Sequence, residues 1–229
     1  MRRHQFKWLL VFFGFGCFSL SAQTQKYDTL PNLPEHYLTR MKTFISEPIA
    51  LGKIMMVGNS ITEGGNWRKL LNDSTIINRG ISGDVTFGVL NRVDDIVKRK
   101  PSKLFLLIGI NDLSRKTPEE VAIENIFNII AKIHAGSPKT QIFVQSILPL
   151  NESFKQFPKS FRENGNHIIT INGQIAKYAE KFNYTYVDIY SKFLDKDGNM
   201  GSNYSTDGLH LNLLGYQYWA GILKEYIAK

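Results

Sequence analysis

The stretch KLFLLIGIND, at residues 103–112, is a short apolar run that ends in a glycine and then in polar residues. A short apolar run bounded by turn residues is typical of a strand buried on both faces of a parallel sheet. Four other runs share this character and alternate along the chain with longer amphipathic segments. They are IMMVG (54–58), TIINRG (75–80), QIFVQSIL (141–148) and YTYVDI (184–189).

The segments between these runs have helical periodicity. The clearest helix is predicted to begin at Thr117, with Pro118 at the first helical position and Glu120 completing a capping box, and to end at Gly136. Strands that alternate with helices predict a three-layer α/β/α sandwich with a five-stranded parallel sheet and right-handed crossovers. The other helices are predicted at 64–72, 85–99, 165–182 and 213–227.

Short polar motifs directly follow three of the predicted strands. GNS ends at Ser60, NRGISGD contains Gly83, and GIND contains Asn111. Active sites of parallel sheets lie at the carboxyl ends of the strands. These three residues are therefore expected at one edge of the sheet.

The segment STDGLHLNLLGY places Asp207 and His210 three residues apart, just before an amphipathic stretch. With Ser60 they supply the parts of a serine hydrolase, which are a nucleophilic hydroxyl, a base, and a carboxylate that orients the base. The backbone N–H groups of Ser60 and Gly83 and the side-chain amide of Asn111 would form the oxyanion hole.

In this order the motifs resemble the four blocks of the SGNH subgroup of the GDSL esterases and lipases, over nearly the whole chain after the first 22 residues. The resemblance implies a flavodoxin-like SGNH hydrolase fold with Ser60, Asp207 and His210 as catalytic residues. The pattern is also similar to small acetylhydrolases of the platelet-activating-factor type and to secreted bacterial carbohydrate O-acetylesterases. The family's usual GDS is GNS here, so Asn59 replaces an aspartate that lies outside the triad.

Each of these residues also has a purely structural interpretation. Ser60 is a good helix cap, Gly83 suits a positive φ, and the side chain of Asn111 can bond to loop backbone. Asp207 can cap a helix, and His210 can be a satisfied, partly buried histidine. Their order, and their common position after strands, favour the catalytic interpretation.

The first 22 residues have the pattern of a secretory signal peptide. Arg2, Arg3 and Lys7 form a charged start, residues 8–20 are apolar, and residues 21–22 are small. The apolar run is too short to span a bilayer comfortably, because a membrane helix needs roughly 20 residues. The protein is therefore expected to be secreted or periplasmic.

Cys17, the only cysteine, lies inside this leader, so cleavage would leave a chain without a thiol. The alternative is a lipid anchor on Cys17, although Gly14 stands where such signals have a branched aliphatic residue. Residues 23–50 are predicted to form an N-terminal arm or short helix packed on the body, and residues 51–229 a single hydrolase domain.

Several other classes of function lack their motifs. There is no phosphate loop of the form GxxxxGK[ST], no GxGxxG after a strand, and no HExxH, so neither a nucleotide cofactor nor a metal is expected. DKDGN, at 195–199, is predicted to be a hairpin turn rather than a calcium loop. Without the leader the chain keeps 25 of its 28 Lys+Arg and all 20 Asp+Glu. The resulting net charge of +5 does not indicate nucleic-acid binding.

The predicted activity is removal of short acyl groups, above all acetyl from O-acetylated carbohydrates such as sialic acids. A lysophospholipase or thioesterase acting on lipids is the alternative, and a secreted glycan-binding protein without turnover is the third interpretation. The sequence leaves the acyl donor and the oligomeric state open. Six tyrosines could line a sugar site or could simply pack: Tyr184, Tyr186, Tyr190, Tyr204, Tyr216 and Tyr218.

Overall fold

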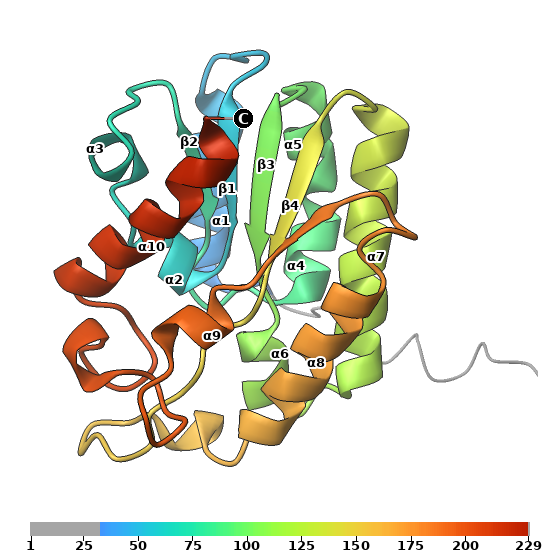
Figure 1. Cartoon of the computed structure of the whole chain (residues 1–229). Helices are drawn as coiled ribbons and strands as arrows, with labels where there is room; N and C mark the ends of the chain where they lie inside the picture. Colours follow the sequence, from blue (N-terminus) through green and yellow to red (C-terminus); the bar gives the residue numbers. More distant parts are fainter. Residues whose placement is uncertain (1–32, 229) are drawn as a thin grey trace, which may run out of the picture.

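The computed structural model describes residues 33–228 of the chain (Figure 1). The expectations of a signal peptide and of a lipid anchor on Cys17 lie outside these residues. Within the segment expected to form an arm, the structure has helix α1 (Glu35–Ser46).

Five strands form one parallel sheet at the centre of the molecule, as predicted (Figure 1). The sheet order is β2-β1-β3-β4-β5, so β1 and β3 are neighbours although β2 lies between them in sequence. The chain therefore winds away from β1 in one direction to reach β2 and in the other to reach β3, β4 and β5. The strands are β1 (Ile54–Gly58), β2 (Ile77–Gly80), β3 (Lys103–Leu107), β4 (Gln141–Gln145) and β5 (Thr185–Val187).

Helices cover both faces of the sheet (Figure 1). Helix α10 (Leu213–Ile227) crosses in front of β1 and β2 in this view, and α1 lies behind them. Helices α7 (Glu119–Gly136) and α8 (Gly165–Lys177) lie on the right of this view, beyond β4, and contact each other. The remaining helices are α2 (Ser60–Glu63), α3 (Trp67–Leu70), α4 (Thr86–Asn91), α5 (Val93–Lys98), α6 (Ile110–Ser114) and α9 (Tyr190–Phe193), with short 3-10 turns at Lys159–Phe161 and Ser202–Tyr204.

The helix predicted at 85–99 is wrong as a single element, because the structure divides it into α4 and α5 at Arg92. Arg92 leaves the helical conformation, with φ −111° and ψ 13°. Its buried guanidinium pairs with Asp84 at 3.0 Å and donates to the carbonyl of Gly58. The helix predicted at 64–72 is shorter than predicted. Only α3 forms within this range, because Gly64 and Gly65 separate it from α2.

The capping box predicted before α7 is also wrong. Pro118 is the N-cap rather than the first helical residue, with φ −55° and ψ 139°, and no side chain caps this end. An extended proline places Thr117 outside the first turn, beyond the reach that a capping box requires. The hairpin turn at 195–199 is confirmed by the antiparallel bridge between Leu194 and Met200, with Gly198 at φ +81°.

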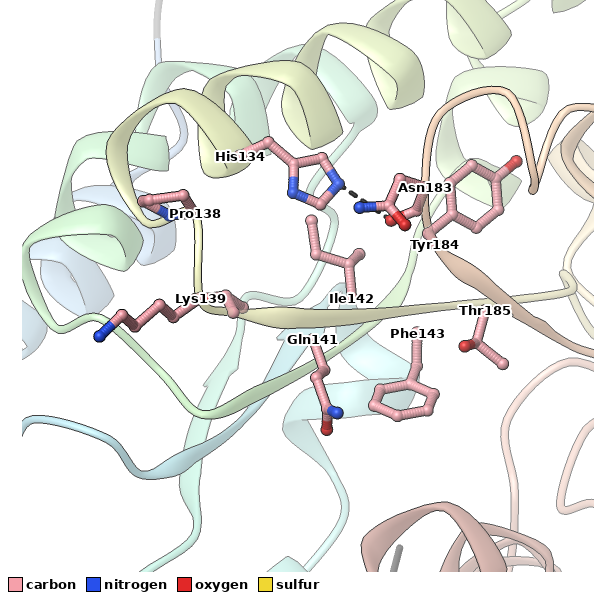
Figure 2. Close-up of a pocket in the computed structure, with 10 residues that line it drawn as sticks. His134, Pro138, Lys139, Gln141, Ile142, Phe143, Asn183, Tyr184 and Thr185 are labelled. Carbon is pink, nitrogen blue, oxygen red and sulfur yellow. Dashed lines mark hydrogen bonds between the residues drawn. The ribbon is translucent and has the colours of Figure 1, made fainter.

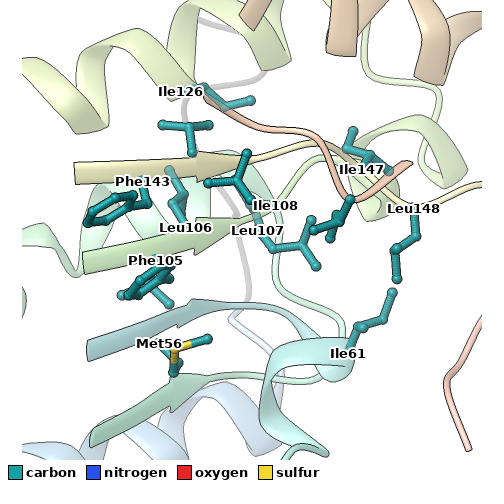
Figure 3. Close-up of a cluster of buried hydrophobic side chains, with 14 of the residues drawn as sticks. Met56, Ile61, Phe105, Leu106, Leu107, Ile108, Ile126, Phe143, Ile147 and Leu148 are labelled. Carbon is teal, nitrogen blue, oxygen red and sulfur yellow. The ribbon is translucent and has the colours of Figure 1, made fainter. Parts of the chain in front are cut away.

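The core lies between the sheet and both helical layers (Figure 3). Met56, Phe105, Leu106 and Phe143 are almost fully excluded from solvent, and the rings of Phe105 and Phe143 stack with centroids 4.6 Å apart. Burial on both sides explains why these strands read as continuous apolar runs. Each fully buried side chain of this size contributes about 1.5 to 3 kcal/mol of transfer free energy.

Two buried arginines attach α1 to the body. Arg99 donates to the carbonyls of Phe44 and Pro48 at 2.5 and 2.9 Å. Arg79, on the edge strand β2, pairs with Glu47 at 2.6 Å and lies over the ring of Phe44 at 4.3 Å. Since buried charges are stable only when paired, these contacts fix α1 against the sheet edge.

Candidate active site

Ser60 lies where β1 ends and α2 begins. Asn59 is the N-cap of α2, and its side-chain oxygen accepts the N–H of Ile61 at 3.0 Å. Only glycine fits at position 58, because a Cβ there would lie 2.3 Å from the carbonyl oxygen of Leu107 and 2.3 Å from the Oγ1 of Thr62. The GNS motif therefore places Ser60 at the carboxyl edge of the sheet, as predicted, and Asn59 provides a capping acceptor such as an aspartate would provide.

His210 and Asp207 lie on a loop closed by the antiparallel bridge between Ser205 and Leu211. The Oδ2 of Asp207 lies 2.7 Å from Nδ1 of His210, and Nε2 of the same ring lies 3.2 Å from the Oγ of Ser60. The three residues thus form the continuous chain of contacts that the sequence predicted. A serine hydrolase uses this geometry to take the hydroxyl proton onto the imidazole.

The environment keeps Asp207 ionised. Burial alone would raise its pKa, but the hydrogen bonds from His210 and Leu209 together lower that pKa below its ordinary value. The side chain of His210 is 40% exposed and that of Asp207 is 21% exposed. A negative carboxylate in this position would stabilise a positive charge on the imidazole, and the exposed part of the ring remains open to a substrate and to water.

The predicted oxyanion donors lie at the same edge. Gly83 has φ +78°, a conformation that favours glycine. Asn111 is buried, and its Nδ2 donates to the carbonyl of Asp84 at 2.8 Å, next to Gly83. Within residues 33–228, neither the N–H of Ser60 nor that of Gly83 donates to another protein group. Both N–H groups are thus available to a bound oxyanion.

A second layer of polar contacts, which sequence reasoning did not assign, holds the loop that carries Gly83. Asp112 accepts the N–H and the hydroxyl of Thr86 at 3.0 and 2.6 Å, and burial raises the pKa of Asp112 to about 6. Asp84 pairs with Arg92 in the interior. Asp112 was visible in GIND, but its partner lies 26 residues away, so the motif alone carried no sign of this role.

The cavity drawn in Figure 2, of about 320 Å³, lies at the opposite edge of the sheet. Gln141 and Thr185, the first residues of β4 and β5, line it together with His134. The imidazole of His134 contacts the carbonyl oxygen of Asn183 at 3.0 Å. This cavity lies at the amino ends of β4 and β5, whereas Ser60 follows the carboxyl end of β1, so the cavity does not belong to the candidate site.

A groove of about 460 Å³ borders α2 on the side of α3 and α10. Gly64 is one helical turn beyond Ser60 and donates its N–H to the carbonyl of that residue at 2.9 Å. The groove is lined by Gly64, Asn66, Lys69, Leu70, Leu213, Tyr216, Gln217 and Lys224. Its walls are thus partly apolar and partly cationic.

The described part of the chain, residues 33–228, contains neither a metal-binding cluster nor a membrane-spanning helix. A metal site would require a group of at least three His, Cys, Asp or Glu side chains, and this part of the chain contains no such group. None of its helices combines the length and the hydrophobicity needed to cross a bilayer.

Similarity to known proteins identifies the class. The GDSL-like Lipase/Acylhydrolase family matches residues 56–218, which include Ser60, Asn111 and His210. The rat platelet-activating factor acetylhydrolase IB subunit alpha2 is 29% identical over 183 residues, covering 76% of this chain and 75% of that protein.

Solved structures show the same relationship. A protein from Streptococcus pneumonia, described as a candidate platelet activating factor, has a TM-score of 0.75 and 30% identity, with 84% of this chain and 92% of that chain covered. An acetyl xylan esterase has a TM-score of 0.64 at 20% identity, with 76% of this chain and 99% of that chain covered, and shows a similar fold.

The fold and the family together define a carboxylic ester hydrolase. More specifically, the chain belongs to the GDSL-like lipase/acylhydrolase family, in its SGNH subgroup.

Proposed function

We propose that Ser60, His210 and Asp207 hydrolyse esters through an acyl-enzyme. The Oγ of Ser60 attacks the acyl carbon, and Nε2 of His210 takes the hydroxyl proton and passes it to the leaving alcohol. Water then attacks the acyl group with the same base, which releases the acid. The observation that carries the proposal is the chain of contacts of 3.2 and 2.7 Å that joins the three side chains.

The oxyanion of each tetrahedral intermediate would be stabilised by the N–H groups of Ser60 and Gly83 and by the amide of Asn111. One such donor typically contributes about 3 to 4 kcal/mol to the transition state. No metal or organic cofactor has a part in this reaction scheme.

We further propose that the acyl group is small and that the natural substrate is an O-acetylated carbohydrate. The exposure of His210 supports a shallow acyl site, and the relatives named as acetylhydrolases favour acetyl as the acyl group. The groove beside α2 would take the alcohol portion, with Tyr216 against a sugar ring and Lys69 and Lys224 near acidic groups. Acidic sugars such as sialic acids fit this charge.

Hydrolysis of a lipid ester is the second candidate. Leu213 is 70% exposed and Leu214 is 48% exposed, and both lie within four residues of His210. Exposed leucines beside the base could receive an acyl chain, with about 0.8 kcal/mol for each methylene buried.

The decisive experiment compares Ser60→Ala with the wild-type enzyme on acetyl and butyryl model esters, on acetylated oligosaccharides and on lysophospholipid. Ser60→Ala should abolish all turnover and leave the thermal midpoint of unfolding nearly unchanged, whereas the exposed control Ser191→Ala should behave as wild type. Turnover by Ser60→Ala equal to the wild type would exclude the proposed nucleophile. A higher kcat/KM on long acyl chains than on acetylated sugars would select the lipid candidate, and glycan binding without turnover by the wild type would select the third interpretation.

A further inference from the structure

Glu63 lies at the end of α2, three residues beyond Ser60. Its Oε2 accepts two hydrogen bonds from Ser82, one from the backbone N–H at 2.5 Å and one from Oγ at 2.7 Å. Ser82 immediately precedes Gly83, whose N–H is a proposed oxyanion donor. The helix that carries the nucleophile is therefore bonded directly to the loop that carries the donor.

The peptide group that contains the N–H of Gly83 is held on both sides. The peptide before it donates the N–H of Ser82 to Glu63, and the peptide after it accepts a hydrogen bond of 2.8 Å from Arg115 to the carbonyl of Gly83. The N–H of Asp84 also donates to the carbonyl of Ile81 at 3.0 Å and closes a turn around this peptide, with Gly83 at φ +78°. The bonds to Glu63 and from Arg115 add to this turn and favour one direction of the N–H of Gly83.

Glu63 is charged and is itself held in place by α1. Nε2 of His36 lies 3.0 Å from Oε2 of Glu63, and Nε of Arg40 lies 3.3 Å from Oε1. Burial would raise the pKa of Glu63, but the hydrogen bonds from His36 and Ser82 and the charge of Arg40 together lower it. The carboxylate is thus an ionised acceptor, which makes its bonds to Ser82 stronger than neutral ones.

We propose that Glu63, together with Arg115, is a positioning residue that aligns the N–H of Gly83 with the oxyanion formed at Ser60. This inference rests on the proposed function. An oxyanion donor acts mainly in the transition state, so its misalignment should lower kcat and leave KM nearly unchanged. An error of about 1 Å in such a position can cost about 100-fold in rate.

The test measures kcat and KM of Glu63→Ala, Glu63→Gln and Arg115→Ala on an acetyl ester, with Glu124→Ala as an exposed control on α7. Glu63→Ala should lose about 10- to 100-fold in kcat, with KM within about twofold of the wild type. Glu63→Gln should recover most of this loss, because an amide oxygen still accepts the N–H of Ser82. Arg115→Ala should lower kcat in the same way as Glu63→Ala, and Glu124→Ala should match the wild type.

A second measurement separates alignment from the docking of α1. Tyr37→Phe removes the hydrogen bond of α1 to the carbonyl of Gly88 but leaves Glu63 and both of its bonds to Ser82, so it should lower the thermal midpoint and keep kcat. An alkyl boronic acid, which forms a tetrahedral adduct with a nucleophilic serine, should bind Glu63→Ala more weakly by the same factor as the loss in kcat/KM.

Three results would overturn the positioning role: a wild-type kcat in Glu63→Ala, a change confined to KM, or a kcat in Tyr37→Phe as low as that of Glu63→Ala. Ser60→Ala in the same assay distinguishes a failure of the proposed function from a failure of the role proposed for Glu63. Activity retained by Ser60→Ala refutes the proposed function, whereas an inactive Ser60→Ala beside a fully active Glu63→Ala refutes only the role of Glu63.

Discussion

The carboxylate of Asp207 holds His210 at two points. Oδ2 lies 2.7 Å from Nδ1 of the imidazole, and Oδ1 accepts the backbone N–H of His210, also at 2.7 Å. The same group thus fixes the position of the residue and the orientation of its ring. With Nδ1 protonated, Nε2 is left free to accept the proton of Ser60.

Replacement of this carboxylate gives the first prediction. Asp207→Asn should lower kcat by about 1,000- to 10,000-fold, because an amide cannot stabilise the imidazolium and favours the wrong tautomer. His210→Ala should lose at least as much. The exposed control Asp197→Asn should leave turnover unchanged. A double variant of Asp207 and His210 that is much slower than His210→Ala alone would contradict the model of one catalytic unit.

The second prediction concerns Asn111. Asn111→Ala should lower kcat by about 100- to 1,000-fold with little change in KM, because an oxyanion donor acts in the transition state. Asn172→Ala is a matched control, since Asn172 is also buried and bonds the backbone of Ile147 at both its N–H and its carbonyl. It should cost stability and spare kcat. An Asn111→Ala variant altered only in KM would make that residue a substrate contact.

The third prediction is a pH dependence of stability due to Asp112. Burial raises its pKa in the folded protein from 3.8 to about 6, so the folded state favours the protonated form. The contribution of Asp112 to the free energy of unfolding is fully present below about pH 4. It falls by roughly 3 kcal/mol as the pH rises through 6, for a pKa shift of this size.

Thermal unfolding of Asp112→Asn at several pH values tests this. The amide cannot ionise. The thermal midpoint of the wild type, measured relative to that of the variant, should therefore decrease as the pH is raised from about 4 to 7. A constant offset is expected in addition, because the variant loses an acceptor for Thr86 at every pH. Asp94→Asn, an exposed substitution on α5, should show no such trend. A difference between wild type and Asp112→Asn that does not change with pH would contradict the prediction.

The fourth prediction uses two glycines with opposite surroundings. A Cβ on Gly80 would lie 2.2 Å from the backbone nitrogen of Glu63, so Gly80→Ala should separate β2 from α2 and destabilise the protein by about 1 to 3 kcal/mol. A Cβ on Gly173, inside α8, would meet nothing within 4 Å. Gly173→Ala should therefore stabilise by about 0.5 to 1 kcal/mol. Only Gly80→Ala should also reduce kcat, and equal effects of the two substitutions on unfolding would refute the close contact.

The fifth prediction is that activity survives prolonged dialysis against a chelator, because the proposed reaction needs only protein groups. The measurement compares kcat before and after dialysis, and after addition of zinc or calcium. Activity that is lost on dialysis and restored by a metal would show that the scheme lacks an essential component.

The strands and the contacts among Ser60, His210 and Asp207 could be predicted because the sequence motifs indicate them. A strand segment buried on both faces must be apolar, as LFLL (104–107) is in β3, and a residue that directly follows such a strand must lie at its carboxyl edge. Asp207 and His210 belong to one short loop, so their contact needed no knowledge of the rest of the chain. The contact of His210 with Ser60, 150 residues away, was expected from the order of the motifs and from their resemblance to the SGNH blocks.

The supporting contacts could not be predicted, since their partners are distant in sequence. The apolar period of 85–99 continues through Arg92, and nothing local indicates that its side chain turns inward to Asp84 and to the carbonyl of Gly58. Glu63 and Ser82 are 19 residues apart and look like ordinary surface residues. Their roles depend on the approach of α2 to β2, which only the folded chain shows.

The neighbouring positions of β1 and β3 have a consequence for how such an enzyme can change. Because the chain winds in opposite directions from these two strands, the loops after them diverge, and open α/β sheets bind their ligands at such a point. The path of the backbone produces this divergence, whereas the proposed reaction depends on a few side chains on short loops. Mutations can therefore alter the preferred ester, or end catalysis, with little effect on the core, so a single ancestral scaffold can diversify into enzymes with different substrates.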